Sequence, residues 1–211
     1  MQNNLLSGLY VLTDSRIHAH SQWPERVELA ILGGADVIQL RDKHLSDDVL
    51  MPIALTIQQI CTHYGVIFIV NDRVTLAKKI YADGVHIGQH DDSLRAARDY
   101  LGNDFLIGMS CYKDLLSALR AQKLGADYVA FGSVFPSSTK VDAPRCPLSI
   151  ISKARSLLRI PVCAIGGITA NNSRHVLAAG AQLIAATHSV FNAHDPMAAA
   201  NKLSHQVIMP R

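Results

Sequence analysis

The feature that most constrains the fold is a series of eight short apolar runs, which recur along the whole chain of 211 residues. Each run is rich in Val, Ile or Leu and lasts about five to seven residues, which is typical of strands buried on both faces of a parallel sheet. The runs begin near Leu9, Asp36, Val66, Gly84, Leu106, Tyr128, Pro161 and Leu183. The sequence therefore predicts an α/β fold built on parallel strands.

Amphipathic stretches with helical spacing separate these runs, at residues 26–32, 47–63, 73–81, 93–100, 113–124, 148–158, 172–179 and 196–205. Gly34, Gly125 and Gly180 follow three of them and can supply the left-handed end of a helix. Eight strand–helix units of roughly 26 residues each suit a compact (β/α)8 TIM barrel. No linker or break in composition divides the chain, so we expect a single domain over residues 1–211.

The alternative architecture is an open, doubly wound sheet. That fold usually carries a glycine-rich phosphate-binding loop directly after its first strand. Here the first apolar run ends in Thr13, Asp14 and Ser15, without such a loop. The barrel is therefore the favoured interpretation.

Composition limits the partners of the chain. The formal net charge is only +3 and no run of Lys or Arg is present, so a nucleic acid is a poor candidate, whereas a small anionic ligand fits well. No segment of about 18 apolar residues could span a bilayer, and residues 1–7 do not resemble a signal peptide. The spacing of Cys61, Cys111, Cys146 and Cys163 suggests buried free thiols in a reducing cytoplasm. The sequence leaves open whether the chain forms a homodimer.

Polar side chains gather where the apolar runs end, and in a barrel all of these ends meet at one rim. At the second run, strand alternation puts Gln39, Arg41 and Lys43 on the same side. Two cations and an amide at a strand end can bind a diphosphate. The alternative is a solvated strand terminus.

Two carboxylates, Asp72 and Asp91, follow the third and fourth runs. They could share one Mg²⁺, which prefers few carboxylates together with water and phosphate oxygens. Both could instead cap the helices that follow. Asn71 could bind the edge of a heterocycle or simply turn the chain.

The sixth and seventh runs lead into further candidate phosphate sites. Residues 137–140 offer hydroxyls and the Lys140 ammonium, and Gly166 and Gly167 would let backbone N–H groups approach a phosphate. The alternatives are an exposed polar loop and a plain turn. His86 lies inside an apolar run and is interpreted as a hydrogen-bonded core histidine.

Taken in order, these motifs resemble the thiamine-phosphate synthase family. The matching residues are Gln39, Arg41, Lys43, Asn71, Asp72, His86 to Gln89, Asp91, Ser110, Pro136 to Lys140 and Ile165 to Ile168. Each motif alone is weak, but the ordered set at strand ends is specific and spans roughly residues 8 to 200.

The resemblance implies a transferase that joins a pyrimidine diphosphate to a thiazole phosphate, in thiamine biosynthesis, with one Mg²⁺ per subunit. It implies that the pyrimidine diphosphate is bound by Gln39, Leu40, Arg41, Asp42, Lys43, Asn71, Ser110 and Lys140. It implies catalytic roles for Arg41, Lys43, Ser110 and Lys140. It implies metal binding by Asp72 and Asp91, and thiazole-phosphate binding by Ser137, Ser138, Thr139, Gly167, Thr187 and His188.

The chain departs from the family pattern at a few positions. Ser137 stands in place of Thr, Asp42 in place of Glu, Thr187-His188 in place of an apolar-Ser pair, and Leu183 in place of Gly. The first rival function is a thiazole tautomerase, which would be expected to lack the two metal carboxylates and the complete loop at 136–140. The second is a non-catalytic sensor of a phosphorylated ligand, which has no need of diphosphate and Mg²⁺ groups. The synthase interpretation is favoured because this chain has both sets of groups.

Overall fold

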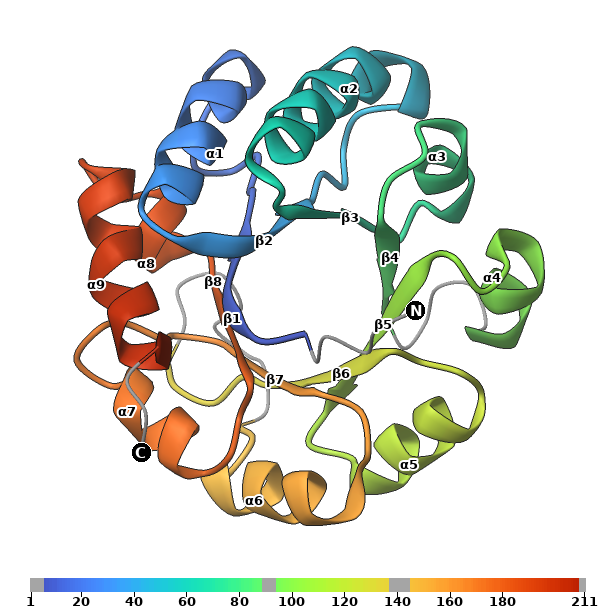
Figure 1. Cartoon of the computed structure of the whole chain (residues 1–211), viewed down its shortest axis with the longest axis vertical. Coiled ribbons are helices and arrows are strands. Elements are labelled where there is room, and N and C mark those ends of the chain that lie inside the picture. Colours follow the sequence, from blue (N-terminus) through green and yellow to red (C-terminus); the bar gives the residue numbers. More distant parts are fainter. Residues whose placement is uncertain (1–5, 89–93, 137–144, 209–211) are drawn as a thin grey trace.

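The computed structural model describes residues 6–88, 94–136 and 145–208. Eight parallel strands pair in chain order, and the last strand pairs with the first, so that the sheet closes into a barrel surrounded by helices (Figure 1). This confirms the predicted (β/α)8 barrel. Within the described part of the chain, no helix is long and apolar enough to cross a membrane.

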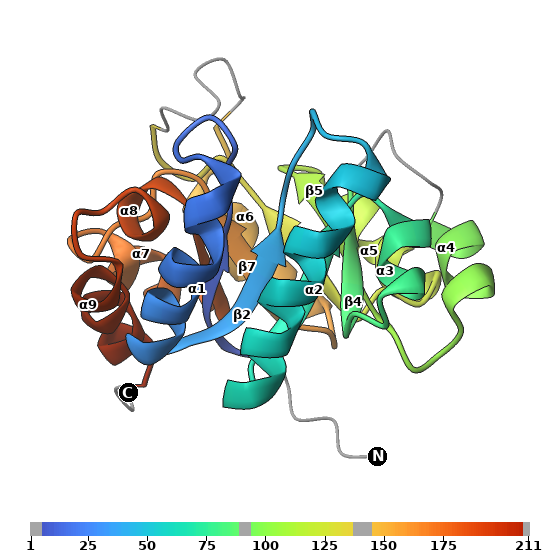
Figure 2. The same ribbon diagram turned by 90° about the horizontal axis from the view of Figure 1, so that it is seen from above.

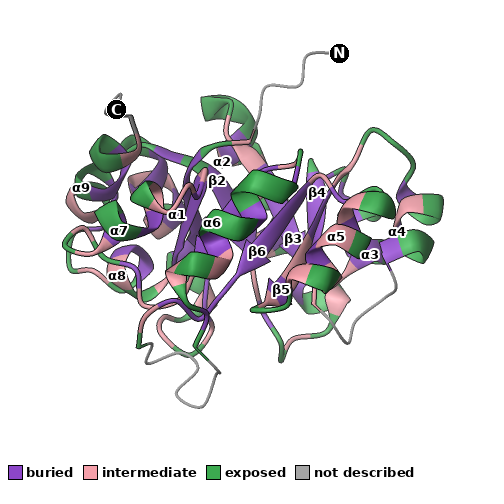
Figure 3. Cartoon of the chain, turned by 90° about the horizontal axis from the view of Figure 1, so that it is seen from below, coloured by how far each residue is buried: buried purple, intermediate pink, exposed green. Residues whose placement is uncertain are grey.

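Each of the eight predicted apolar runs overlaps one strand. The strands are β1 (Gly8–Leu12), β2 (Ala35–Leu40), β3 (Ile67–Asn71), β4 (Gly84–Ile87), β5 (Leu106–Tyr112), β6 (Tyr128–Phe131), β7 (Val162–Ile165) and β8 (Leu183–Ala186). Most of their residues are buried, because the barrel interior covers one face and the helices cover the other (Figure 3).

The predicted helices are present as α1 (Trp23–Leu32), α2 (Asp47–Tyr64), α3 (Val74–Lys79), α4 (Leu94–Leu101), α5 (Leu115–Lys123), α6 (Leu148–Leu157), α7 (Ser173–Ala178) and α9 (Pro196–Ile208). Two short elements were not predicted: the 3₁₀ helix η1 (His20–Gln22) and the helix α8 (His188–Phe191). Both are too short for a repeating apolar pattern to reveal them.

Strand alternation divides the apolar side chains into an inner and an outer core. On β2, Val37 packs inside the barrel, whereas Ile38 and Leu40 pack against the surrounding helices. Tyr10 and Tyr128 belong to the inner core, and Trp23 belongs to the outer one. The same alternation points Gln39 of β2 into the barrel, so the polar residues at strand ends can meet at the barrel mouth.

The carboxyl ends of the strands all face the same side of the barrel, as the β2 arrow and the turn that follows it show in Figure 2. The backbone is fixed there by side-chain hydrogen bonds between neighbouring strand ends. Thr13, after β1, donates from its hydroxyl to the Arg41 carbonyl over 3.2 Å and accepts from the Arg41 N–H over 2.8 Å. The fold therefore presents a firmly held rim, on which most of the predicted site residues lie.

Candidate active site

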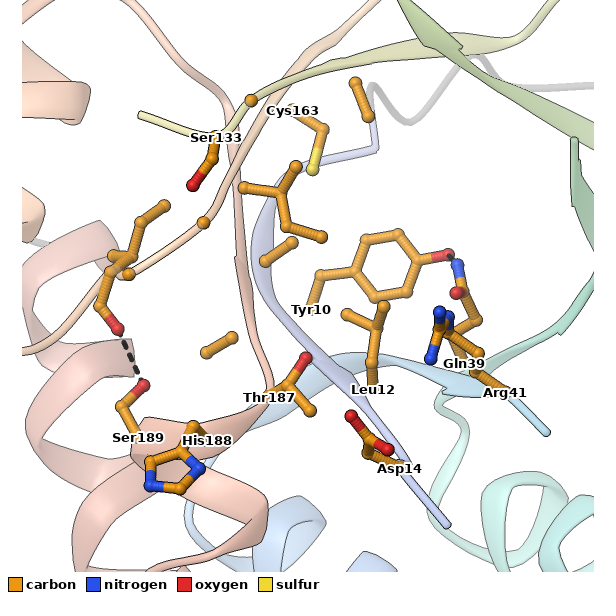
Figure 4. A pocket seen from close by; sticks show the side chains of 18 of the residues that line it. Tyr10, Leu12, Asp14, Gln39, Arg41, Ser133, Cys163, Thr187, His188 and Ser189 are labelled. Atoms are coloured by element: carbon orange, nitrogen blue, oxygen red, sulfur yellow. Dashed lines mark hydrogen bonds between the residues drawn. The ribbon is translucent and has the colours of Figure 1, made fainter. Parts of the chain in front are cut away.

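A cavity of about 320 Å³ opens at the carboxyl ends of the strands. Every strand contributes to its wall, through Tyr10 and Leu12 (β1), Gln39 (β2), Asn71 (β3), His86 (β4), Ser110 (β5), Ala130 (β6), Cys163 (β7) and Ala185 (β8). Residues that follow the strands complete the rim, including Gly167, and Arg41, Thr187 and His188, which Figure 4 labels; His188 is the first residue of α8. Its volume and its mixture of apolar walls and polar groups suit a small organic ligand.

Only part of the predicted cationic group lines the cavity. Gln39 and Arg41 line it, whereas Lys43, which was predicted on the same side, is not among the lining residues. The ammonium of Lys43 lies 3.2 Å from the carboxylate of Asp72, which links the end of β2 to the end of β3. The side chain of Lys43 is about half exposed, so its ammonium has room to meet an anion at the rim.

Asp14 is a buried carboxylate of the cavity wall that sequence analysis missed. Burial raises the pKa of this carboxyl, but the hydrogen bonds and charge of Arg16, together with the charge of Arg41, bring the pKa below its usual value. Asp14 is therefore negatively charged at neutral pH and helps to neutralise the guanidinium of Arg41. The signal that could have identified it is its position directly after the first strand.

Leu40 and Asp42 do not line the cavity, contrary to their expected role in binding the pyrimidine diphosphate. The alternation of β2 explains Leu40, which is 1% exposed and packs against the helices. Asp42 is also buried, and it accepts hydrogen bonds from His20 Nε2 and from the N–H groups of His44 and Leu45. Its side chain therefore shapes the loop between β2 and α2 and does not point toward a ligand.

Arg73 strengthens this loop from the outside. It donates to the carbonyls of Asp42 and Leu45 over 3.0 and 2.7 Å, and it forms an ion pair with Asp47. Burial would raise the pKa of the Asp42 carboxyl, but the bonds from Leu45, His20 and His44 together hold that pKa well below its ordinary range. The negatively charged carboxylate of Asp42 therefore holds the loop that carries Lys43 in its conformation.

We expect Asp42→Asn to lower the free energy of unfolding by about 2 kcal/mol at neutral pH, because charge-assisted hydrogen bonds are weakened. A carboxyl with a lowered folded-state pKa stabilises the protein above its unfolded pKa of about 4, and this contribution is lost as the pH falls further. Urea unfolding of the wild type and the variant between neutral and acidic pH measures the difference. A difference that does not shrink in acid would show that the charge of Asp42 does not stabilise the loop.

The predicted metal carboxylates can be examined only in part, because Asp91 lies outside the described residues. Asp72 follows β3 with a left-handed backbone (φ 63°), and its N–H donates to the His86 carbonyl. The N-cap position of α3 is occupied by Arg73, not by Asp72. Among the described residues no group of three or more His, Cys, Asp or Glu side chains could hold a metal by itself. A metal at Asp72 would therefore draw further ligands from Asp91, water or substrate.

Asn71 supplies an unsatisfied hydrogen-bond donor at the cavity. It lines the cavity and is 7% exposed, and its Nδ2 atom has no hydrogen-bond partner among the residues that the structure describes. A buried amide N–H group without a partner is unfavourable unless a ligand or a water molecule accepts a hydrogen bond from it. This favours the interpretation of Asn71 as a ligand-binding group over its role as a simple turn residue.

His86 and Ser110 belong to a hydrogen-bonded chain at the base of the cavity. His86 Nε2 lies 2.9 Å from Ser110 Oγ, and His86 Nδ1 lies 3.0 Å from the Tyr128 hydroxyl. The chain continues from Tyr128 to Tyr10 over 2.8 Å and from Tyr10 to Gln39 over 2.7 Å. His86 is hydrogen-bonded and buried, as interpreted from the sequence, but it also lines the cavity. Sequence analysis did not identify the two tyrosines as part of the site. The signal that could have identified them is a phenol hydroxyl within an otherwise apolar strand.

The opposite wall holds the glycine pair and the loop after β8. Gly166 and Gly167 both have positive φ, and a Cβ atom on either would overlap the neighbouring loop, at Ser133 and at Pro136 respectively. The Ser189 hydroxyl donates to the Ile168 carbonyl over 2.7 Å and joins this loop to α8 (Figure 4). The glycines are therefore required by close backbone packing, which also brings Gly167 to the cavity wall.

The remaining thiazole-side residues are placed as follows. Thr187 and His188 line the cavity near Ser189 (Figure 4). Leu183 begins β8 and is fully buried in the inner core, at the opposite end of that strand from Thr187. Ser137, Ser138, Thr139 and Lys140 lie outside the described residues. The structure thus brings Gln39, Arg41, Asn71, Ser110, Gly167, Thr187 and His188 to one cavity.

Comparisons with known proteins agree with this arrangement. The family described as thiamine monophosphate synthase matches residues 9–190. The chain is 45% identical to the thiamine-phosphate synthase of Thioalkalivibrio sulfidiphilus over 94% of both chains. It is 46% identical to that of Methanocella arvoryzae over 92% of both chains.

A solved structure shares the fold as well. The thiamine phosphate pyrophosphorylase from Pyrococcus furiosus superposes with a TM-score of 0.87 and 38% identity, with 95% of each chain covered. The sequence profile, the relatives and the superposition all extend over most of the chain and include the cavity. The chain therefore belongs to the thiamine monophosphate synthase family.

Proposed function

We propose that the protein joins an aminopyrimidine that carries a diphosphooxymethyl group to a thiazole phosphate, or to its carboxylated tautomer, and releases thiamine phosphate and diphosphate, together with CO2 when the carboxylated tautomer is the substrate. The observation that carries the proposal is that Gln39, Arg41, Asn71 and Ser110, from three different strands or their ends, meet at one cavity. They provide a cation and several hydrogen-bonding groups, which are what an aminopyrimidine diphosphate requires. Family membership supports the same reaction.

In this reaction the bond between the methylene carbon and the diphosphate oxygen breaks, and its electron pair leaves with the diphosphate. The thiazole nitrogen then donates its electron pair to the methylene carbon. The difficult step is the departure of an anion, so the protein must stabilise negative charge. Arg41 and Lys43 lie where they can do so, and Lys140 would add a third cation.

The donor chemistry at the end of β3 fits a magnesium ion. Asp72 supplies a carboxylate that lies 3.2 Å from Lys43, and a hard cation of this kind binds few carboxylates together with phosphate oxygens. Asp72 and Asp91 would hold one ion per subunit. When bound, Mg²⁺ would neutralise charge on the departing diphosphate.

The thiazole phosphate would bind at the opposite wall, near Gly167, Thr187 and His188, with Ser137 to Thr139 as further ligands. The residues that line the cavity extend from Gln39 to Ser189, and we propose that the two substrates bind side by side along it. The thiazole nitrogen would then reach the methylene carbon directly after the diphosphate has left.

Four buried cysteines without disulfide bonds support a reducing compartment, and we propose the cytoplasm. The partners that we propose are the two phosphorylated substrates. That no nucleic acid takes part stays a prediction, and whether the chain forms a homodimer stays open.

Diphosphate release tests the proposed reaction. The purified protein is incubated with both substrates and Mg²⁺, and diphosphate is measured with a coupled assay. We expect release only when both substrates are present, and abolition by EDTA that excess Mg²⁺ reverses. Conversion of the thiazole tautomer without release of diphosphate would instead support the tautomerase alternative. Ligand binding without any turnover would support the sensor alternative.

A further inference from the structure

A chain of four hydrogen bonds crosses the interior of the barrel beneath the cavity. It runs from Gln39 through Tyr10, Tyr128 and His86 to Ser110, and no link is longer than 3.0 Å. Its members come from β2, β1, β6, β4 and β5, and its two end residues both line the cavity. The middle of the chain is buried: Tyr10 and Tyr128 are 2% and 1% exposed.

The first bond favours one direction for the others. Gln39 Nε2 donates to the Tyr10 hydroxyl, and Figure 4 shows the amide directed at the Tyr10 ring tip. Either hydroxyl could donate in the bond between Tyr10 and Tyr128. Because the Tyr10 oxygen already accepts from Gln39, the favoured arrangement has Tyr10 donate to Tyr128 and Tyr128 donate to His86 Nδ1. His86 Nδ1 is then an acceptor, and neutral His86 carries its proton on Nε2 and donates to Ser110 Oγ.

This direction determines what the two ends offer to a ligand. At one end, one hydrogen of the Gln39 amide nitrogen is donated to Tyr10, which orients the amide and leaves its oxygen available as an acceptor and its second hydrogen as a further donor. At the other end Ser110 Oγ accepts from His86, so its own hydroxyl hydrogen is available as a donor. The reversed chain would exchange these roles, because an amide and a hydroxyl can each donate or accept.

Two further features favour a fixed chain. Burial raises the pKa of both Tyr10 and Tyr128, so each phenol keeps its hydrogen at physiological pH. Gly108 lies beside Tyr128, and a Cβ atom at that position would overlap the phenol ring. The missing side chain at residue 108 is therefore what leaves space for the central link.

We propose that Tyr10, Tyr128 and His86 are positioning residues that hold His86 in its Nε2–H tautomer and fix Gln39 as an acceptor and Ser110 as a donor for the heterocycle. An aminopyrimidine has an amino donor and ring-nitrogen acceptors, which this pair matches. The choice of the pyrimidine as the ligand rests on the proposed function. The donor–acceptor direction of the hydrogen-bonded chain is argued from the hydrogen bonds alone.

The test separates the two ends of the chain with two variants. Tyr128→Phe removes the bond to His86 Nδ1, whereas Tyr10→Phe removes the partner of Gln39 and leaves Tyr128 beside His86. The control is Tyr64→Phe, which also removes one phenol hydrogen bond, to Glu28, but on the exposed end of α2. The folded state of each variant is verified by circular dichroism and thermal unfolding.

The first readout is the tautomer of His86 in the protein without substrate. Two-bond ¹H–¹⁵N spectra of ¹⁵N-histidine protein distinguish the ring nitrogens, and His86→Gln identifies the signal among the ten histidines. We expect the Nε2–H tautomer in the wild type and in Tyr64→Phe. We expect a mixture of tautomers in Tyr128→Phe, which lacks the bond to Nδ1, and in Tyr10→Phe, in which Tyr128 can either donate to His86 or accept from it. An Nδ1–H tautomer in the wild type, or an unchanged spectrum in Tyr128→Phe, would overturn the proposal.

The second readout is the dissociation constant of the pyrimidine diphosphate, measured by calorimetry with Mg²⁺ and without thiazole phosphate. We expect both Tyr10→Phe and Tyr128→Phe to weaken binding about 10-fold, because each releases an oriented end group. Wild-type affinity in both variants would also overturn the proposal. Neither readout requires turnover. A protein that lacks synthase activity but shows the expected tautomers would therefore contradict the proposed function and leave the proposal about the hydrogen-bonded chain standing.

Discussion

Replacement of Asp72 by asparagine is expected to lower kcat for thiamine phosphate formation about 100-fold or more, because it removes a charge that would hold Mg²⁺ beside the departing diphosphate. Asparagine is the informative substitution, since it keeps the size of the side chain and tolerates the left-handed backbone at this position (φ 63°). Steady-state rates at saturating substrates and Mg²⁺ measure the effect.

Two comparisons make the Asp72 result interpretable. Asp99→Asn, on the exposed face of α4, should leave kcat unchanged. Thermal unfolding of Asp72→Asn should stay close to that of the wild type, because Asp72 does not occupy the N-cap position of α3. Near-normal turnover in a folded Asp72→Asn protein would mean that Asp72 only pairs with Lys43 and binds no catalytic metal.

Arg41→Ala is expected to raise the KM for the pyrimidine diphosphate about 100-fold, because a charge-assisted contact to the diphosphate is lost. The loop itself should remain in place, since Thr13 binds the N–H and carbonyl of Arg41 and not its side chain. Initial rates with varied pyrimidine diphosphate and saturating thiazole phosphate give the KM.

Arg41→Lys and Arg95→Ala provide the controls for this prediction. Lysine restores the charge but not the paired geometry of a guanidinium, so Arg41→Lys should recover only part of the affinity. Arg95 is exposed on α4, and its replacement should not change the KM. If Arg41→Ala raised only the KM for the thiazole phosphate, the two substrates would bind at opposite ends to those proposed here.

The barrel could be predicted from the sequence because its strands are buried on both faces. A strand that is buried on both faces requires apolar residues at consecutive positions, and polar residues appear where each such run ends. Of the three residues predicted to share one side, Gln39 and Arg41 line the cavity, because the alternation of a strand is a local property, whereas Lys43 lies beyond the end of β2 and is not among the lining residues. The same rule could have excluded Leu40 from the cavity, since it points the opposite way.

The hydrogen-bonded chain could not be predicted, because its links join residues far apart in the sequence. Tyr10 and Tyr128 are separated by 118 positions and meet only when the barrel closes. Asp42 shows a related limit: its spacing fits a binding motif, but its carboxylate is used by His20 and by two backbone N–H groups of its own loop. Local patterns show where polar residues are and not which partners satisfy them.

The most direct test of the central claim is the identity of the product. Both substrates are incubated with the wild-type protein and Mg²⁺, and the products are separated, identified and quantified by mass spectrometry. We predict thiamine phosphate in equal amount to the diphosphate released, and a much lower yield from Asp72→Asn and Arg41→Ala under the same conditions. Diphosphate release without the joined product, or neither product from a folded wild-type protein, would contradict the assignment of this cavity as a thiamine-phosphate-forming site.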